Sequence, residues 1–236
     1  MYRFKFNVAT ILACFIFLAI PAEAGVVVSG TRVIYPENEN EVTVKVTNKG
    51  NTPVLIQAWI DEGDQNVEPA KIMAPFVITP PMNRINPDKG QTLRITNINQ
   101  KSLPDDRESL FWLNVLEIPS IAPAAASKNK LQIAFRTRIK MFYRPSNLKH
   151  SSVSVAESLQ WSLHKDNLKI QNNSPFHITL LNVKPANGKS EITLPMIKPF
   201  DSVTVSVDSN QFKNGMQLYY RFINDYGSVK EAQTTI

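Results

Sequence analysis

The sequence predicts an all-β protein built from two β-sandwich domains in tandem. Short runs in which apolar and polar residues alternate recur along the chain between turn residues, whereas helical spacing of apolar residues is not evident over any useful length. About seven such runs fall within roughly 120 residues, which is typical of an immunoglobulin-like sandwich. A second set follows Pro145, whose ring cannot donate a ladder hydrogen bond and therefore suits a domain boundary.

Each expected strand is a run of apolar or alternating residues bounded by turn-forming residues. In the first domain the expected strands cover residues 26–35, 42–46, 54–60, 76–79, 93–95, 110–118 and 131–143. In the second domain they cover residues 153–155, 159–163, 168–170, 178–183, 192–194, 203–207 and 218–223. Asn187 and Gly188 tolerate positive φ and indicate a hairpin turn in the second set.

The first 24 residues have the features of a secretory signal peptide. Arg3 and Lys5 precede the apolar run 8–20, and small residues follow up to Ala24, after which we expect cleavage. As a helix the run would span about 20 Å, less than the roughly 30 Å of a bilayer core, so no stable membrane insertion is expected. Cleavage also removes Cys14, which leaves the exported chain without cysteine. The expected division is residues 1–24 as signal peptide, 25–145 as an N-terminal immunoglobulin-like domain and 146–236 as a C-terminal one.

Composition argues against catalysis and metal binding. The chain has three histidines and one cysteine, too few for a typical protein-built zinc site, so neither a metal nor a cofactor is expected. His150, His164 and His177 lie in no HExxH or GxSxG motif, which makes a secreted enzyme the weaker interpretation. The net charge of +6 is compatible with nucleic acid, a membrane surface or a merely basic protein surface. The signal peptide argues against nucleic acid.

The segment 131–143 is longer than a typical strand. At about 3.3 Å per residue it would reach roughly 43 Å, whereas strands usually have five or six residues. Leu131, Ile133 and Phe135 begin its apolar face, and the opposite face is mostly polar or charged. Two interpretations remain open: an inner strand that crosses from one domain to the next, or a strand that pairs with a strand of a partner.

The charged face of this segment carries Arg136, Arg138, Lys140 and Arg144. Such a row can be a solvated surface, a nucleic-acid stripe or a site for a carboxylate, which neighbouring Arg and Lys side chains bind through charge-assisted hydrogen bonds. Few aromatic residues are interleaved to stack on bases, so the nucleic-acid interpretation is weak. Arg32 would supply a further cation if the first strand lies near this one.

Several motifs occur together in one order along the chain. They are 30–36 (GTRVIYP), 50–53 (GNTP) through Trp59, the Pro80–Pro81 pair, 106–111 (DRESLF), 116–119 (LEIP), 132–145 (QIAFRTRIKMFYRP) and 223–227 (INDYG). Taken in this order, they resemble the periplasmic pilus-assembly chaperones of the bacterial chaperone–usher pathway, over essentially the whole exported chain.

The resemblance implies two immunoglobulin-like domains that meet at an angle and leave a cleft. It implies a periplasmic chaperone that lends its long strand to pilin subunits, which lack their own final strand, with Leu131, Ile133 and Phe135 filling the subunit's groove. Arg32 and Lys140 would bind the subunit's terminal carboxylate at the base of the cleft and so set the register of pairing. By simple alternation Lys140 faces away from the apolar row, which a bulge or a change of surroundings could explain.

The same resemblance implies roles for two further groups of residues. Glu108, Arg144 and Asp225 match a polar network that would fix the angle between the domains, the alternative being that they are ordinary surface charges. Prolines that would contact the usher correspond to Pro53 and to Pro80 or Pro81.

The partners that the resemblance implies are pilin subunits and an outer-membrane usher, with self-association of the free protein as a further expectation. Delivery of the subunits to the usher would lead to pilus assembly. The competing interpretation is a secreted structural pilin or adhesin. Such a protein would be shorter and would often carry a disulfide, which the exported chain cannot form.

Overall fold

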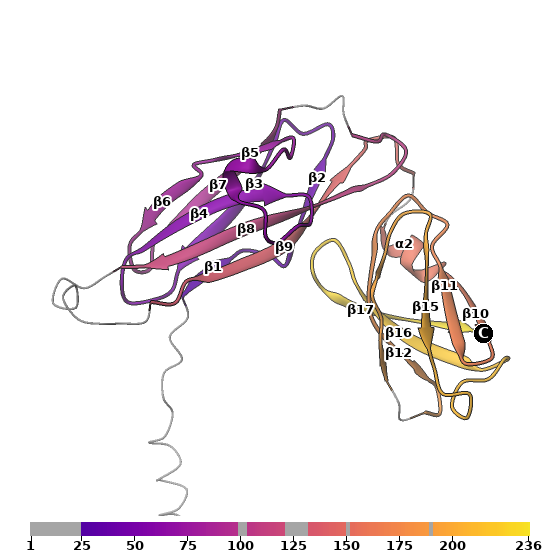
Figure 1. Ribbon diagram of the computed structural model, residues 1–236. Coiled ribbons are helices and arrows are strands. Elements are labelled where there is room, and N and C mark those ends of the chain that lie inside the picture. Colours follow the sequence, from indigo (N-terminus) through magenta and orange to yellow (C-terminus); the bar gives the residue numbers. More distant parts are fainter. Residues whose placement is uncertain (1–24, 99–102, 121–131, 150–151, 189–190) are drawn as a thin grey trace, which may run out of the picture.

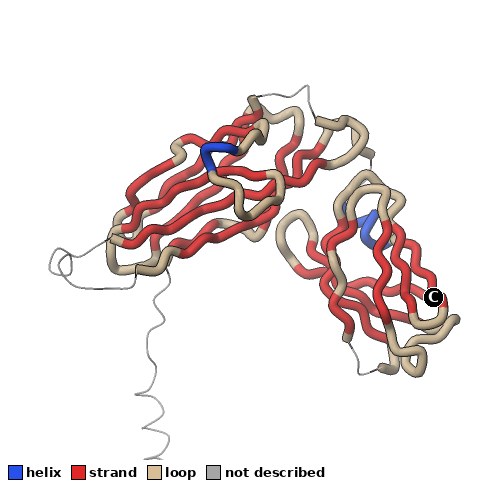
Figure 2. Tube along the Cα trace, viewed as in Figure 1, coloured by secondary structure: helices blue, strands red, loops and turns tan. Residues whose placement is uncertain are grey.

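The computed structural model describes residues 25–98, 103–120, 132–149, 152–188 and 191–236. Figure 1 shows two β domains set at an angle to each other. Strands dominate both domains, as Figure 2 makes clear. The predicted all-β class with two sandwich domains is therefore confirmed. Within the described ranges, no helix has the length and apolar character needed to cross a membrane.

Domain 1 is a sandwich of two sheets. One sheet has the order β1 (Val26–Val28), β3 (Glu41–Asn48), β7 (Gly90–Asn97) and β5 (Phe76–Thr79). The other has the order β2 (Arg32–Pro36), β9 (Phe135–Arg144), β8 (Ser109–Pro119), β4 (Val54–Asp61) and β6 (Met82–Ile85), and a short 3₁₀ turn, η1 (Pro69–Lys71), lies between β4 and β5.

The core of domain 1 follows from strand alternation, because every second side chain of a strand points to the same face. Val44 and Leu93 in one sheet and Ile56, Leu113 and Met141 in the other are all buried in one apolar cluster. The sequence pattern therefore located the core-facing rows of these strands.

Two predicted strands of domain 1 are not formed over their whole predicted length. The expected strand 26–35 is two strands in different sheets, β1 and β2, because the chain crosses between the sheets at Gly30, whose φ is +88°. Alternation runs through both pieces, so it gave no sign of the break. The expected strand 131–143 begins at Phe135: residues 132–134 are described but are not part of a strand, and Leu131 lies outside the described residues.

Domain 2 is a second sandwich. Its three-stranded sheet has the order β10 (Gln160–His164), β11 (Asn167–Gln171) and β15 (Ser202–Ser206). Its other sheet has the order β13 (Ile192–Thr193), β12 (Ile178–Pro185), β16 (Gln217–Ile223) and β17 (Val229–Thr235), with β14 (Met196–Ile197) paired to β12.

The expected strand 153–155 is wrong, because this segment is the helix α2 (Ser152–Glu157). Val155 and Ala156 in this helix are buried, as is Leu159, which lies two residues beyond its end. The valines at 153 and 155 are separated by one residue, which is the spacing expected in a strand. The segment is also too short for a 3.6-residue period to be recognised from the sequence.

Candidate partner-binding site on β9 and at the domain junction

The strand β9 has an open edge over its first half. β8 pairs with β9 from Phe135 to Tyr143, but β2 pairs with it only from Lys140 to Arg144. Among the described residues, no strand pairs with the other edge of β9 from Phe135 to Ile139. Phe135 is 65% exposed and Ile133, just before the strand, is 55% exposed. The chain therefore presents unpaired backbone groups and apolar side chains side by side.

Arg32 and Lys140 are neighbours at the point where this open edge ends. β2 and β9 run parallel with Arg32 opposite Lys140, and residues opposite each other across two strands share a face of the sheet. Met141 and Tyr143 alternate with Lys140 and face the core. The register between β8 and β9 is continuous, so Lys140 faces away from the apolar row without a bulge.

The cations of this pair are partly buried and carry no ion pair among the described residues. Burial lowers the pKa of Lys140, and the neighbouring charge of Arg32 lowers it further. Burial also lowers the pKa of Arg32, against the opposing effect of the carboxylates of Asp225 and Glu108. The Nη1 of Arg32 donates to the carbonyl of Ile223 at 3.2 Å, whereas its buried Nε has no described acceptor. Two desolvated like charges disfavour each other, and an incoming anion would relieve this.

Arg138 does not join Arg32 and Lys140 as an unpaired cation, and it does not belong to a solvated face. Its guanidinium forms an ion pair with the buried carboxylate of Asp61 and lies 4.2 Å from the centre of the Trp112 ring. Asn114 and the backbone N–H of Gly63 also donate to Asp61, each at 2.7 Å. Burial opposes the charged form of Asp61, but these hydrogen bonds outweigh it and hold its pKa below the ordinary value. Asp61 was not predicted from the sequence. Its strand, β4, is separated from β9 by β8, and this strand order cannot be read from alternation along β4 alone.

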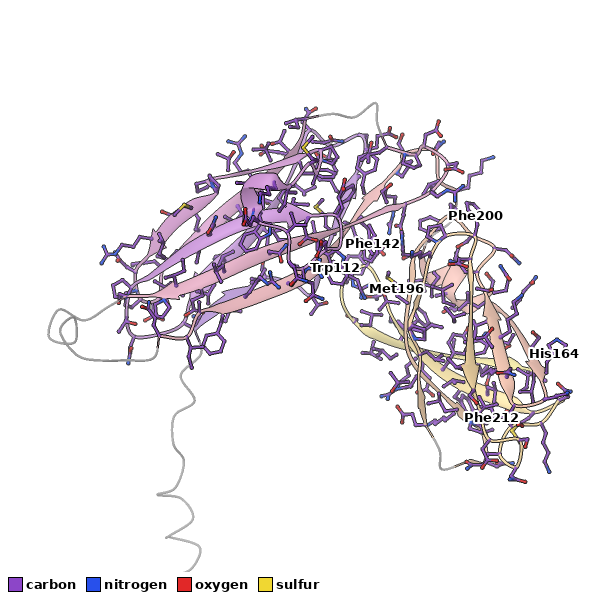
Figure 3. All side chains as sticks on the ribbon, in the orientation of Figure 1. Trp112, Phe142, His164, Met196, Phe200 and Phe212 are labelled. Carbon is purple, nitrogen blue, oxygen red and sulfur yellow. The ribbon has the colours of Figure 1, made fainter. Side chains whose placement is uncertain are left out.

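The ring of Trp112 lies close to both Lys140 and Arg138. The Nζ of Lys140 lies 5.6 Å from the centre of its ring, and Arg138 lies over the same ring. In Figure 3, Trp112 and Phe142 lie at the end of domain 1 that approaches domain 2. An aromatic face stabilises a nearby cation by about 0.5–2 kcal/mol, depending on how far it is desolvated. The ring therefore helps to keep the Lys140 ammonium charged in a partly buried position.

The structure brings Glu108, Arg144 and Asp225 together at the domain junction. Arg144 Nε donates to Glu108 Oε1 at 2.8 Å, and its two terminal nitrogens donate to the carboxylate of Asp225 at 2.7 and 3.0 Å. Glu108 is nearly fully buried, and its second oxygen accepts the backbone N–H of His177 at 2.7 Å. Ser152 also donates to Asp225, at 2.8 Å. Residues of both domains thus satisfy one another's charges.

The junction is closely packed around this network. Burial opposes the charged form of Asp225, but the hydrogen bonds from Arg144 and Ser152 and the charge of Arg144 outweigh it, so the pKa of Asp225 lies below the ordinary value.

Aromatic side chains also pack at the junction: the ring centres of Phe142 and His177 are 5.4 Å apart. The pocket enclosed here has a volume of about 10 Å³, which leaves room for about one water molecule. The side chains of the network therefore leave little unfilled space at the junction.

The prolines expected to contact an usher lie at two places on domain 1. Pro53 directly precedes β4, and the pair Pro80 and Pro81 lies between β5 and β6. The carbonyl of Pro81 accepts the backbone N–H of Ala58 at 2.8 Å, so it is separated from Pro53 by five residues of β4, roughly 16 Å. The structure thus places Pro53 and the Pro80–Pro81 pair near opposite ends of the edge strand β6 and does not bring them into one cluster.

Comparison with known proteins follows the division into two sandwiches. A family model described as "Pili and flagellar-assembly chaperone, PapD N-terminal domain" matches residues 25–149, and one described as "Pili assembly chaperone PapD, C-terminal domain" matches residues 154–234. The probable fimbrial chaperone YadV of Escherichia coli strain K12 is 39% identical over 222 residues, which is 90% of each chain. The chaperone protein MrkB of Klebsiella pneumoniae is 38% identical over 226 residues, covering 94% of this chain and 96% of the relative.

Solved structures give the same result. The crystal structure of the YadV chaperone has a TM-score of 0.75 at 37% identity and covers 90% of this chain and 100% of that one. The structure of the Salmonella enterica SafA pilin in complex with the SafB chaperone gives a match with a TM-score of 0.76 at 27% identity, covering 92% of this chain and 99% of that one. The fold and the site define a two-sandwich protein with an open sheet edge beside a pair of cations. The chain belongs to the PapD-type family of chaperone–usher pilus-assembly chaperones.

Proposed function

We propose that the protein binds pilin subunits in the periplasm by pairing one of their strands with the open edge of β9, and delivers them to an outer-membrane usher for pilus assembly. The observation that carries the proposal is the end of that open edge at Arg32 and Lys140. The similar chaperone SafB, whose structure is that of a complex with the SafA pilin, supports the choice of partner.

The open edge has a defined length and direction. It covers Phe135 to Ile139, roughly 16 Å of strand, before β2 takes over the same edge at Arg32. A guest strand that follows the line of β2 and ends where β2 begins would bring its terminal carboxylate to Arg32 and Lys140. Since both cations lack a described carboxylate partner, they would bind that terminus by charge-assisted hydrogen bonds and fix the register of pairing.

The exposed apolar side chains would supply affinity. Ile133 and Phe135 are more than half exposed, and burying such a side chain in a partner's groove stabilises a complex by roughly 1.5–3 kcal/mol. Leu131 belongs to the same row in the sequence and has the same proposed role, although it lies outside the described residues. The sheet edge provides backbone pairing, and the side chains provide the fit.

The remaining assignments belong to the same proposal. Residues 1–24 direct export to the periplasm, and residues 25–145 and 146–236 form the two domains. Glu108, Arg144 and Asp225 hold the domains at their angle. Pro53, together with Pro80 or Pro81, contacts the usher. The relatives are named as fimbrial chaperones, which favours this role over that of a structural pilin or adhesin.

The test is co-purification of a fimbrial subunit from the periplasm with Lys140→Ala or Arg32→Ala protein. Loss of one partner of a charge pair at a protein interface costs about 2–5 kcal/mol, so we expect binding to weaken by about 30-fold or more. Lys45→Ala, which removes an exposed lysine from the opposite sheet, is the matched control and should bind as wild type does. A Lys140→Ala protein that recovers the subunit at wild-type yield would rule out the proposed anchor.

A second variant tests the strand edge without touching the cations. Ile133→Asp places a charge where an apolar groove would receive the side chain, and an unpaired buried charge is strongly disfavoured. Because Ile133 is exposed in the free protein, the variant should have the same thermal unfolding midpoint as the wild type. Normal complex formation by this variant would contradict strand donation.

A further inference from the structure

The turn between β16 and β17 reaches from domain 2 to the cation pair of domain 1. In Figure 1 this yellow hairpin extends from its own sheet toward β8 and β9. A Cβ atom placed on Gly227 would lie 2.3 Å from the hydroxyl oxygen of Thr31, so the backbone of the turn lies directly against the residue before Arg32. At the start of the turn, the carbonyl of Ile223 accepts from Arg32 at 3.2 Å. One end of the turn therefore contacts Arg32 itself, and the other end contacts Thr31 beside it.

The turn is held in one conformation by its own hydrogen bonds. The Asn224 side-chain oxygen accepts the backbone N–H groups of Tyr226 and Ser228, at 3.1 and 2.9 Å. The Asn224 N–H donates to the Ser228 carbonyl at 3.0 Å. Asp225, the residue before Tyr226, is tied to Arg144 of domain 1. The backbone on both sides of Tyr226 is thus fixed.

Tyr226 is nevertheless 91% exposed, more than any other aromatic residue that the structure describes. A single exposed aromatic side chain on a protein surface is ordinary. This one lies on a fixed turn whose two ends contact Thr31 and Arg32, and Arg32 is paired in register with Lys140. Because the backbone that carries the ring is already fixed near this pair, contact with a ligand bound there would order only the Tyr226 side chain.

We propose that Tyr226 is a specificity-determining residue for the carboxyl terminus of the bound subunit, whose carboxylate Arg32 and Lys140 hold while the tyrosine ring packs on an apolar side chain among its last two residues. The inference rests on the proposed function and extends it from the terminal carboxylate to the side chains next to it. A basic side chain at that place would be repelled by the two cations, and an acidic one would compete with the carboxylate for them. An uncharged side chain remains, and among uncharged side chains an apolar or aromatic one makes the best use of the large contact area of a tyrosine ring.

The experiment measures how fast a subunit leaves the purified chaperone–subunit complex in the presence of excess competing wild-type chaperone. Tyr226→Ala should release the wild-type subunit about 3- to 10-fold faster, while Tyr226→Phe, which keeps the ring, should release it at the wild-type rate. Val229→Ala, at an exposed position of the same hairpin, is the matched control and should also behave as wild type. Because the Tyr226 side chain is exposed, Tyr226→Ala should leave the thermal unfolding midpoint unchanged.

A subunit variant completes the test as a double-mutant cycle. When the apolar side chain among the subunit's last two residues is shortened to Ala, wild-type and Tyr226→Ala chaperones should release the subunit at the same rate. Equal release of the unaltered subunit by both chaperones would overturn the proposal, as would acceleration by Tyr226→Ala that is the same for both subunits. If the wild-type subunit binds and requires Lys140 but not Tyr226, only this inference fails. If no subunit binds the wild-type chaperone, the proposed function fails with it.

Discussion

The two halves of β9 have the same sequence pattern and different surroundings. In the second half, Met141 and Tyr143 are completely buried in the core of domain 1, with β8 on one side and β2 on the other. In the first half, Phe135 continues the same alternating row but is 65% exposed, and one edge is unpaired among the described residues.

Under the proposed function, one strand serves both stability and binding. The second half contributes backbone pairing and apolar burial to the protein's own domain, as any inner strand does. In the first half, the same kinds of group remain available to another chain. We therefore expect substitutions in the second half to change the free energy of unfolding, and substitutions in the first half to change affinity for a partner.

The largest effect on stability is expected at the last residue of β9. Arg144→Ala leaves the buried carboxylate of Glu108 without its charged partner and removes the contacts to Asp225. Breaking a buried ion pair in this way costs about 3–5 kcal/mol, so the thermal unfolding midpoint should fall clearly. The matched control is Arg94→Ala, which breaks an exposed pair with Glu41 and should leave the midpoint nearly unchanged. Similar midpoints for the two variants would mean that the junction network contributes nothing to stability.

A cavity in the second half of β9 should have a slightly smaller effect. Met141 is fully buried, and Met141→Ala should lower the free energy of unfolding of domain 1 by about 2–5 kcal/mol, measured by urea titration. Met73→Ala removes the same side chain from a site that is 87% exposed and should leave stability as in the wild type. A Met141→Ala protein of unchanged stability would mean that β9 is not part of the domain's own core.

The first half of β9 should respond in binding and not in stability. Phe135→Ala removes an exposed ring, so we expect an unchanged unfolding midpoint and subunit binding weaker by roughly 1.5–3 kcal/mol. Val77→Ala, at an exposed position of the opposite sheet, should alter neither property. Phe135→Ala would contradict the division if it lowered stability as strongly as Met141→Ala does.

The smallest effect is a dependence of stability on acid pH. The pKa of Asp225 is held below its ordinary value in the folded protein, so its contribution is complete above the unfolded-state pKa of about 4 and is lost as the pH falls through the lower folded-state pKa. The unfolding midpoint should therefore decline below about pH 4, and less steeply in Asp225→Asn. Asp88→Asn, at an exposed loop carboxylate, should keep the wild-type decline. Parallel declines in all three proteins would remove Asp225 from the acid response.

The sequence predicted the all-β class and most strands because alternation reports burial on one face of a sheet directly. It could not predict the helix α2, because two valines separated by one residue fit a strand as well as they fit a helix of only six residues. It also missed β17, whose residues Val229–Thr235 are mostly polar and exposed on the edge of a sheet. An edge strand with little burial has little apolar alternation to recognise.

The residues of the candidate site could be predicted from the resemblance to a known family, but not from the local sequence pattern. Arg32 and Lys140 are more than a hundred positions apart in the sequence, and the parallel pairing that joins them depends on strand order rather than on local pattern. The same holds for Asp61, which neutralises Arg138 and so distinguishes it from Lys140. Periodicity assigned each cation to a face of its strand, but the charge balance of that face depends on strands from elsewhere in the chain.

The exposure of Ile133 and Phe135 has a consequence for release. Neither side chain belongs to the core cluster of its own domain. If they bind a subunit as proposed, its departure would leave the packing of that core unchanged. Release would then require no refolding of the chaperone's core, and the energetic cost of separation would lie in the apolar surface that both partners expose to water again. If the subunit exchanges that surface for another strand, the chaperone returns intact and can begin a further cycle.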